Sequence, residues 1–126
     1  MREGKTHTTN VINSKDRNGN SPLSITVSKQ DLEMMRFLIE NGADVNIEDF
    51  FRVPPMYYAV TKGTKEMIEL LIDEKASISG YFSYAGEKRT LIGWAIDKNS
   101  SEKIEVLLNH GASPDGKFDF NDYSQD

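Results

Sequence analysis

The amino-acid sequence predicts an all-α fold of stacked helix pairs, and three observations support this prediction. Three segments of 33 residues, 16–48, 49–81 and 85–117, align with one another. Each segment holds two short stretches in which apolar residues recur three and four positions apart, as they do on one face of a helix. Helices of about ten residues are marginal when isolated. Each unit is therefore expected to be stable only against its neighbours, as in a one-dimensional stack.

The first helix of each segment is expected near residues 22–29, 55–62 and 91–98. Ser21 and Thr90 place a hydroxyl where the first and the third of these helices need an N-cap. Pro54 stands at that position before the second, where the missing cap costs about 1 kcal/mol.

The second helix of each segment is expected near residues 32–41, 65–74 and 101–110. Asp31, Thr64 and Ser100 stand where these helices need their N-caps. Gly63 and Asn99 come just before two of the caps, and both tolerate the left-handed conformation of a tight turn. Gly42 and Gly111 are expected to end second helices in the same conformation.

The rest of the chain consists of two ends and one insertion. Residues 1–15 form an N-terminal flank, whose last six residues resemble the end of a preceding unit, and residues 82–84 are left over between the second and third segments. Residues 118–126 form an acidic tail with three aromatic residues, Phe118, Phe120 and Tyr123. We expect the tail aromatics to cover the exposed face of the last unit, because an open-ended stack needs a cap.

Several columns of the alignment resemble the pattern of a known repeat family. In the first segment they are Asp16, Gly19, Ser21-Pro22-Leu23 and the run Gly42-Ala43-Asp44-Val45-Asn46. The second segment agrees at Asp49, Pro55, Ala59, Gly63, Glu66, Leu71 and Ala76, and the third at Thr90, Ala95, Glu102, Leu107, Leu108 and Gly111-Ala112. The resemblance implies an ankyrin-repeat solenoid of antiparallel helix pairs with projecting β-hairpin-like fingers. It also implies a non-enzymatic protein that binds other proteins through its finger tips and first helices.

The chain departs from the family pattern mainly in its second segment. Lys75 replaces the glycine that ends the second helix, and a side chain there in a left-handed conformation costs about 1 kcal/mol. Arg52 replaces the turn glycine of the second finger, and the histidine of the family is absent from all three segments. We therefore expect weakened loops and irregular fingers around the second segment, with the third finger lengthened by the insertion.

Composition excludes several classes of protein. The 126 residues carry a formal net charge of −5, which argues against general nucleic-acid binding. No segment approaches the roughly 20 apolar residues of a membrane helix, and the polar N-terminus is no secretory signal. The chain has no cysteine, which fits the cytoplasm. We expect a cytoplasmic monomer without membrane insertion.

Catalytic, metal and cofactor motifs are missing from the sequence. His7 lies in the polar start, and His110 suits a helix end better than a catalytic site. The run Asp16–Asn20 matches the first positions of a calcium-binding loop. However, Ser21 stands where that loop needs glycine, and Val27 stands where it needs glutamate. We therefore expect no enzyme activity, no metal site and no cofactor.

Aromatic residues are concentrated outside the predicted helices, and clusters of exposed aromatics mark contact surfaces. We predict a protein partner, identity unknown, held by an aromatic ridge on neighbouring fingers and by the adjacent helical surface. The predicted contact residues are Phe50, Phe51, Val53, Tyr81, Phe82, Tyr84 and Arg89, with Lys62 and Lys98 beside them. The alternative is that these rings pack on one another and brace the fingers. A mixture of inward and outward rings is the expected outcome.

Two other interpretations of the sequence stay open. The chain could be a structural fragment of a longer ankyrin array, as the remnant before residue 16 suggests. A small-molecule or nucleotide site would need convergent cationic and aromatic groups, for which Trp94 with Lys98 is the candidate pair. The four aromatics inside predicted helices, Phe37, Tyr57, Tyr58 and Trp94, are expected to be mostly core.

Overall fold

Residues 11–78 and 81–111 are the part of the chain that the computed structural model describes, and they form six helices and one β-hairpin. The helices are α2 (Pro22–Ser28), α3 (Leu32–Glu40), α4 (Pro55–Thr61), α5 (Lys65–Asp73), α6 (Leu91–Asp97) and α7 (Ser101–Asn109). The strands are β1 (Phe82–Tyr84) and β2 (Glu87–Arg89). Each helix lies within two residues of its expected position. The tail aromatics Phe118, Phe120 and Tyr123 and residues 1–10 of the N-terminal flank lie outside the described residues.

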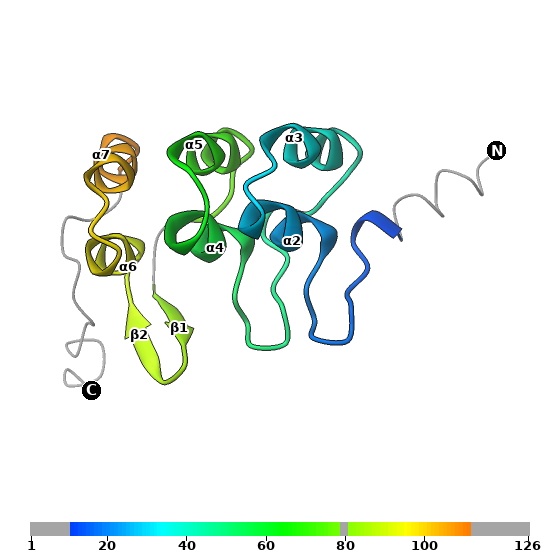
Figure 1. Ribbon diagram of the computed structural model, residues 1–126, viewed down its shortest axis with the longest axis horizontal. Helices are drawn as coiled ribbons and strands as arrows, with labels where there is room; N and C mark the ends of the chain where they lie inside the picture. The colour runs from blue at the N-terminus through cyan, green and yellow to red at the C-terminus, as the bar shows by residue number, and fades with distance from the viewer. Residues whose placement is uncertain (1–10, 79–80, 112–126) are drawn as a thin grey trace.

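The helices form three pairs that stand side by side (Figure 1). Helices α3, α5 and α7 make one layer, and α2, α4 and α6 make the other. Three loops, the last of them the β-hairpin, project from the layer of α2, α4 and α6 away from the other layer. Each helix contacts its pair partner and the equivalent helix of the next pair. This mostly helical arrangement is the one expected for ankyrin-type helix pairs.

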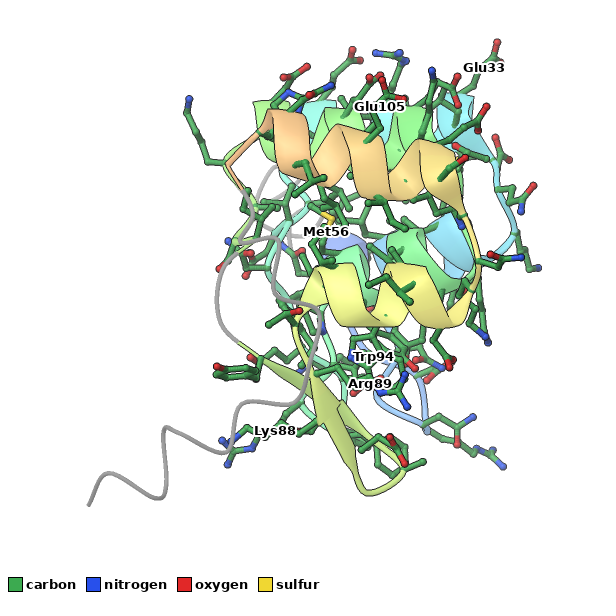
Figure 2. The ribbon with its side chains drawn as sticks, turned by 90° about the vertical axis from the view of Figure 1, so that its left-hand side faces the viewer. Glu33, Met56, Lys88, Arg89, Trp94 and Glu105 are labelled. Carbon is green, nitrogen blue, oxygen red and sulfur yellow. The ribbon has the colours of Figure 1, made fainter. Side chains whose placement is uncertain are left out.

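The hydrophobic core lies between the two layers. Met56, which is 1% exposed, points from α4 into this space (Figure 2). The equivalent leucines of α5 and α7, Leu71 and Leu107, are both fully buried. Seven- and nine-residue helices are too short to persist alone. Their stability therefore comes from this shared apolar interior.

The predicted N-caps are confirmed. Ser21 and Thr90 accept hydrogen bonds from amides three residues later, at 3.2 and 3.1 Å. Asp31, Thr64 and Ser100 do the same for the second helices, at 3.1, 3.3 and 3.3 Å. Helix α4 has Pro54 at the cap and no side-chain cap bond.

The turns after the second helices are left-handed, as predicted. Gly42 has φ 99° and Gly111 has φ 95°, and Lys75 adopts φ 71° at the equivalent place despite its side chain. The prediction for Gly63 is wrong, because its φ is not positive, whereas Asn99 does have φ 56°. Gly63 instead lies against α4, where a Cβ would stand 2.9 Å from Ala59 Cα. Close packing, not backbone conformation, requires glycine there.

The second finger is regular, contrary to the expectation. The amide of Asp16 donates to the carbonyl four residues later at 2.9 Å, and the amide of Asp49 does the same at 3.0 Å. Gly19 closes the first turn with φ 87°, and Arg52 closes the second with φ 65°. Arg52 therefore takes on the left-handed conformation of the missing glycine, and the shape of the turn is kept.

The insertion makes the third finger a regular hairpin. Strands β1 and β2 pair antiparallel, with Phe82 opposite Arg89 and Tyr84 opposite Glu87. Ala85 and Gly86 form the two-residue turn with φ 55° and 84°. Two successive positive φ angles are typical of the type I′ turn that matches strand twist.

Two asparagine side chains link successive loops of the stack. Asn13 donates through Nδ2 to Gly42 O at 3.1 Å, and its Oδ1 accepts from the amide of Asp44 at 2.8 Å. Asn46 Oδ1 accepts from the amide of Ser77 at 3.0 Å. Asn13 therefore occupies the structural position that Asn46 occupies one helix pair later, which agrees with the sequence similarity of the two segments.

Candidate functional site

The second finger is held in shape by one buried carboxylate. Asp49 is 6% exposed, and its Oδ1 accepts from the amides of Phe51 and Val53 at 2.8 and 3.0 Å. Its Oδ2 accepts from the Tyr58 hydroxyl of α4 at 2.6 Å. The tip of the finger is therefore fixed both to its own backbone and to a helix.

Two phenylalanines stand at this fixed tip and face solvent. Phe50 is 64% exposed and Phe51 is 66% exposed. The Phe50 ring packs against Gly19 of the first finger. A Cβ added to Gly19 would lie only 2.5 Å from this ring. Lys15 Nζ lies 6.0 Å from the centroid of the same ring. The adjacent pair of rings forms an exposed apolar surface in a position that the turn dictates.

A groove of about 300 Å³ lies beside the tip, between the first two fingers and the helices α2 and α4. Its lining residues are Asn18, Asn20, Ser24, Ile25, Ser28, Lys29, Asp49, Phe51, Tyr58 and Lys62. Lys62 Nζ lies 5.8 Å from the centroid of the Tyr58 ring. The groove therefore brings together an exposed aromatic residue, two lysines and several uncharged polar groups.

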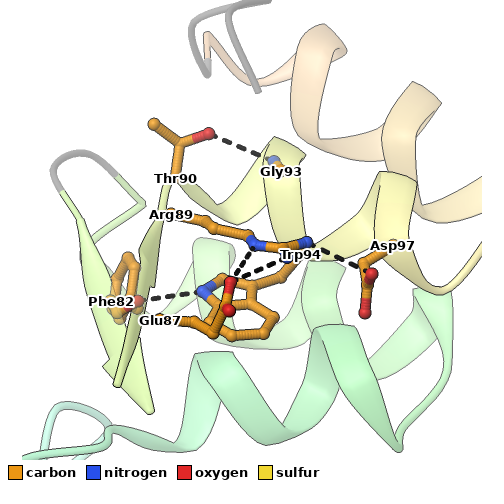
Figure 3. Close-up of polar contacts among 7 residues, drawn as sticks. All are labelled: Phe82, Glu87, Arg89, Thr90, Gly93, Trp94 and Asp97. Atoms are coloured by element: carbon orange, nitrogen blue, oxygen red, sulfur yellow. Dashed lines mark hydrogen bonds and ion pairs between the residues drawn. The ribbon is translucent and has the colours of Figure 1, made fainter. Parts of the chain in front are cut away.

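The third finger is anchored to α6 by a tryptophan (Figure 3). Trp94 Nε1 donates to Phe82 O at 2.9 Å, across the boundary between hairpin and helix. The Arg89 guanidinium lies over the indole, 5.0 Å from the ring to Cζ. Tyr57 meets the indole edge-on, with centroids 5.2 Å apart. The hairpin is thus braced by an aromatic cluster that reaches into α4.

Arg89 is held between two carboxylates. Its Nη2 lies 2.8 Å from Glu87 Oε1, and its Nη1 lies 3.2 Å from Asp97 Oδ1 (Figure 3). Hydrogen bonding to Glu87 and to Asp97 raises the pKa of Arg89 against the opposing effect of burial, so the guanidinium stays charged. Arg89 primarily fixes the hairpin to α6 and leaves only part of its surface for a partner.

The predicted contact residues separate into three groups. Phe50, Phe51, Lys62 and Lys98 are exposed. Tyr81, Phe82 and Arg89 are partly buried, and Phe82 packs against the core. Val53 is 1% exposed, so the prediction that it faces a partner is wrong. Its position just before α4 turns its side chain inward. The Tyr84 side chain is not among the described ones.

The aromatic residues follow the expected mixture, with one correction. Tyr57 and Trp94 are each 6% exposed, but Phe37 of α3 is 55% exposed, so its assignment to the core is wrong. In the candidate pair for a small-molecule site, Trp94 with Lys98, the indole is engaged by neighbouring side chains. One face of the indole is covered by Arg89 and its edge by Tyr57, while Lys98 is exposed at the helix end.

The contributions of Asp49 and Tyr58 to the finger do not follow from the repeat pattern. The pattern identifies Asp49 only as a repeat column and predicts Tyr58 to be core. The signal available was the pairing of an aspartate at a finger start with a hydroxyl-bearing residue nine positions later, in a segment that lacks the histidine of the family. Tyr58 thereby adds a side-chain bond that holds the start of this finger to α4.

The described residues contain no group of three or more histidine, aspartate or glutamate side chains placed to hold a metal ion. In the same part of the chain, no helix is long and apolar enough to cross a membrane.

Comparison with known proteins identifies residues 18–50 as a match to the ankyrin repeat family. Over 65 residues, 52% of the chain, the sequence is 31% identical to the human transient receptor potential cation channel subfamily A member 1. Over 60 residues, 48% of the chain, it is 40% identical to the probable 26S proteasome regulatory subunit p28 of Saccharomyces cerevisiae. These matches span 6% and 26% of the two relatives. The chain is thus similar to parts of two much longer proteins.

Proposed function

We propose that this chain is a non-catalytic, cytoplasmic protein-binding module, a monomer made of three ankyrin-type units stacked as a solenoid. Its partner is another protein, held by the tip of the second finger and by the groove beside it. The observation that carries the proposal is the pair Phe50 and Phe51, each about two-thirds exposed on a turn that Asp49 fixes. Ankyrin repeats, which residues 18–50 match, are in general protein-interaction modules.

The geometry of the tip suits binding energetically. Interface energy is concentrated in a few large side chains, with aromatics prominent among them. A turn that is already ordered loses less conformational entropy on binding than a mobile loop does. Phe50 and Phe51 would therefore anchor the partner, while Lys62 and the hairpin residues Tyr81, Phe82 and Tyr84 would extend the contact.

The name of the yeast relative is compatible with this role. The yeast relative is named as a regulatory subunit of the 26S proteasome, and a subunit contacts other proteins. We propose the same general role for this chain, without carrying over the assembly itself.

A capture experiment with a matched control tests the proposal. Tagged wild-type chain and the variant Phe50→Ser/Phe51→Ser are incubated with cytosolic extract, and the retained proteins are quantified by mass spectrometry. The control is Met34→Ser/Phe37→Ser, which removes two apolar side chains of α3 that are 45% and 55% exposed. All three chains are first compared by thermal melting.

The proposal requires a protein that wild type and control retain and the finger variant loses. Equal retention by all three folded chains would show that the second finger is not the contact surface.

A further inference from the structure

Three lysines end the three helices that face the fingers. Lys29, Lys62 and Lys98 are the C-cap residues of α2, α4 and α6, and all three are exposed. Lys29 and Lys62 line the groove beside the second finger. Because α4 contacts both α2 and α6, the same position in successive helices places the lysines in one row along the stack.

Helix capping alone does not account for this row. A cation at a helix C-terminus is favoured by the helix dipole, but the dipole is the same in both layers. The helices of the other layer have Asn41, Glu74 and His110 as their C-cap residues, so none of those three helices ends in a lysine. Lysine is therefore repeated only on the layer that faces the fingers, among the described helices.

The carboxylates near the row are occupied elsewhere. Asp49 accepts bonds from two backbone amides and from the Tyr58 hydroxyl, and Asp97 pairs with Arg89. Both ion pairs found among the described residues involve Arg89. None of the three lysines forms an ion pair among the described residues, so their charges are open to a partner, although the whole chain has a net charge of −5.

The distribution of acidic residues sharpens the contrast. Glu33 of α3 and Glu105 of α7 belong to the layer of α3, α5 and α7 and point away from the hairpin (Figure 2). Lys103 of α7 adds a cation on the inner side, where its Nζ donates to Val60 O of α4 at 2.9 Å. Burial lowers the pKa of Lys103 and the charge of Lys98 lowers it further, whereas the charge of Glu102 raises it. Lys103 therefore adds a third lysine beside Lys62 and Lys98, where α4 and α6 end.

The spacing of the row restricts what can bind it. Neighbouring packed helices lie about 8–10 Å apart. A polyproline II segment has three residues per turn and rises about 3.1 Å per residue, so every third side chain returns to one face after roughly 9 Å. Residues three positions apart on such a segment would match the helix spacing.

We propose that the lysine row, Lys29, Lys62 and Lys98, binds an extended acidic segment of the partner protein that carries aspartate or glutamate at every third position. This inference rests on the proposed protein-binding function and assigns the chemistry of the partner. The carboxylates would meet one lysine per helix pair, and Phe51 would mark the finger side of the same groove. The row is an exposed feature, so binding of this kind is electrostatic and weakens as salt rises.

Synthetic peptides test the register directly. The probe is a fluorescent peptide of four Pro-Pro-Glu triplets, and its binding is measured by fluorescence anisotropy at low and at physiological ionic strength. One comparison peptide has the same composition with the four glutamates adjacent, and another has glutamine in place of glutamate. We expect the spaced acidic peptide to bind more tightly than both.

Variants with equal net charge test the location. Lys62→Gln/Lys98→Gln removes two members of the row, and the control Arg36→Gln/Lys75→Gln removes two exposed cations of the other layer. An exposed ion pair changes affinity by about 1.4- to 5-fold, so the row variant should lose between about 2- and 30-fold. The variant Lys62→Arg/Lys98→Arg should bind the peptide as wild type does, because it keeps both positive charges. Melting curves confirm that each variant is folded.

The inference is supported if the spaced peptide is preferred and only the row variant loses it. It is overturned if spaced and clustered peptides bind alike, if the control loses as much as the row variant, or if the spaced peptide does not bind at low ionic strength. None of the peptides contains an aromatic residue, and Phe50 and Phe51 are left intact. A negative peptide result therefore does not contradict partner capture by the finger tip. A negative capture result likewise does not contradict peptide binding by the lysine row.

Discussion

The Tyr58 hydroxyl anchors the second finger to α4 by donating a hydrogen bond to Asp49 Oδ2 at 2.6 Å. Tyr58→Phe removes this donor from a carboxylate that is 6% exposed. We expect the free energy of unfolding to fall by about 1–3 kcal/mol, because a buried charged acceptor loses its partner. Urea denaturation measures the change.

A double-mutant cycle separates this bond from other effects of the ring. In an Asp49→Ala background, Tyr58→Phe should cost close to nothing, since the two groups are coupled to each other. An equal cost in both backgrounds would mean that the hydroxyl acts through another contact.

The surroundings of Lys103 lower the pKa of its ammonium group. Burial lowers its pKa below the ordinary 10.5, the charge of Lys98 lowers it further, and Glu102 opposes both. The unfolded chain therefore binds this proton more tightly than the folded chain. The resulting destabilisation is present below the folded pKa and disappears as pH rises through that value towards about 10.5.

Nuclear magnetic resonance titration of Lys103 checks this account. The pKa should lie below the ordinary value, and Lys98→Gln should raise it only in part, because burial is the larger cause. A pKa at the ordinary value in wild type, or full restoration by Lys98→Gln, would contradict the assigned order of causes.

At the level of single side chains, the sequence predicted which residue types make contacts but not which way they face. Phe50 and Phe51 are exposed as expected, whereas the neighbouring Val53 is core. The hydrogen bonds of Asp49 account for this difference, because they fix a backbone conformation in which Val53 points inward and Phe50 and Phe51 point outward. Asp16 accepts the equivalent two amide bonds in the first finger, so these bonds belong to the repeat, whereas the added bond from Tyr58 is specified by no repeat pattern.

At the scale of the element, the ends of the second helices offer a matched pair of substitutions. Lys75 has φ 71° where the first unit has Gly42 with φ 99°. Lys75→Gly should raise the free energy of unfolding by about 1 kcal/mol, because it relieves a left-handed side chain. Gly42→Ala should lower it by about the same amount, since a Cβ there meets no neighbour within 4 Å and only the backbone is strained. Opposite signs in urea denaturation are required, and equal signs would show that contacts outweigh backbone conformation.

Helices were predicted well because their signals are local. Ser21, Thr64 and Ser100 accept the cap bonds that their positions indicated. The fingers were predicted less well, because Arg52 adopts a left-handed conformation that its type disfavours but the surrounding turn enforces. The role of Gly63 could not be predicted from local sequence either, because glycine is needed there for close packing against Ala59.

At the scale of the whole molecule, the middle helix pair differs from the outer pairs in its number of neighbours. Helix α4 contacts both α2 and α6, and α5 contacts both α3 and α7. In a stack of this kind, stability is close to a sum of unit and nearest-neighbour terms. Among the described helices, the middle pair therefore takes part in both interfaces, while each outer pair takes part in one. The division into three repeats stays a prediction, but its energetic consequence can be measured.

Leu71 of α5 and Leu107 of α7 occupy equivalent positions and are both fully buried, so they form a matched test. Each leucine-to-alanine change should cost about 2–5 kcal/mol from lost burial and the cavity left behind. Leu71→Ala weakens both interfaces, so amide hydrogen exchange should accelerate in α2 and α3 as well as in α6 and α7. Leu107→Ala should accelerate exchange mainly in α6 and α7 and leave α2 and α3 protected. If both variants accelerate exchange equally along the whole chain, the pairs unfold as one cooperative block and nearest-neighbour stacking does not describe their energetics.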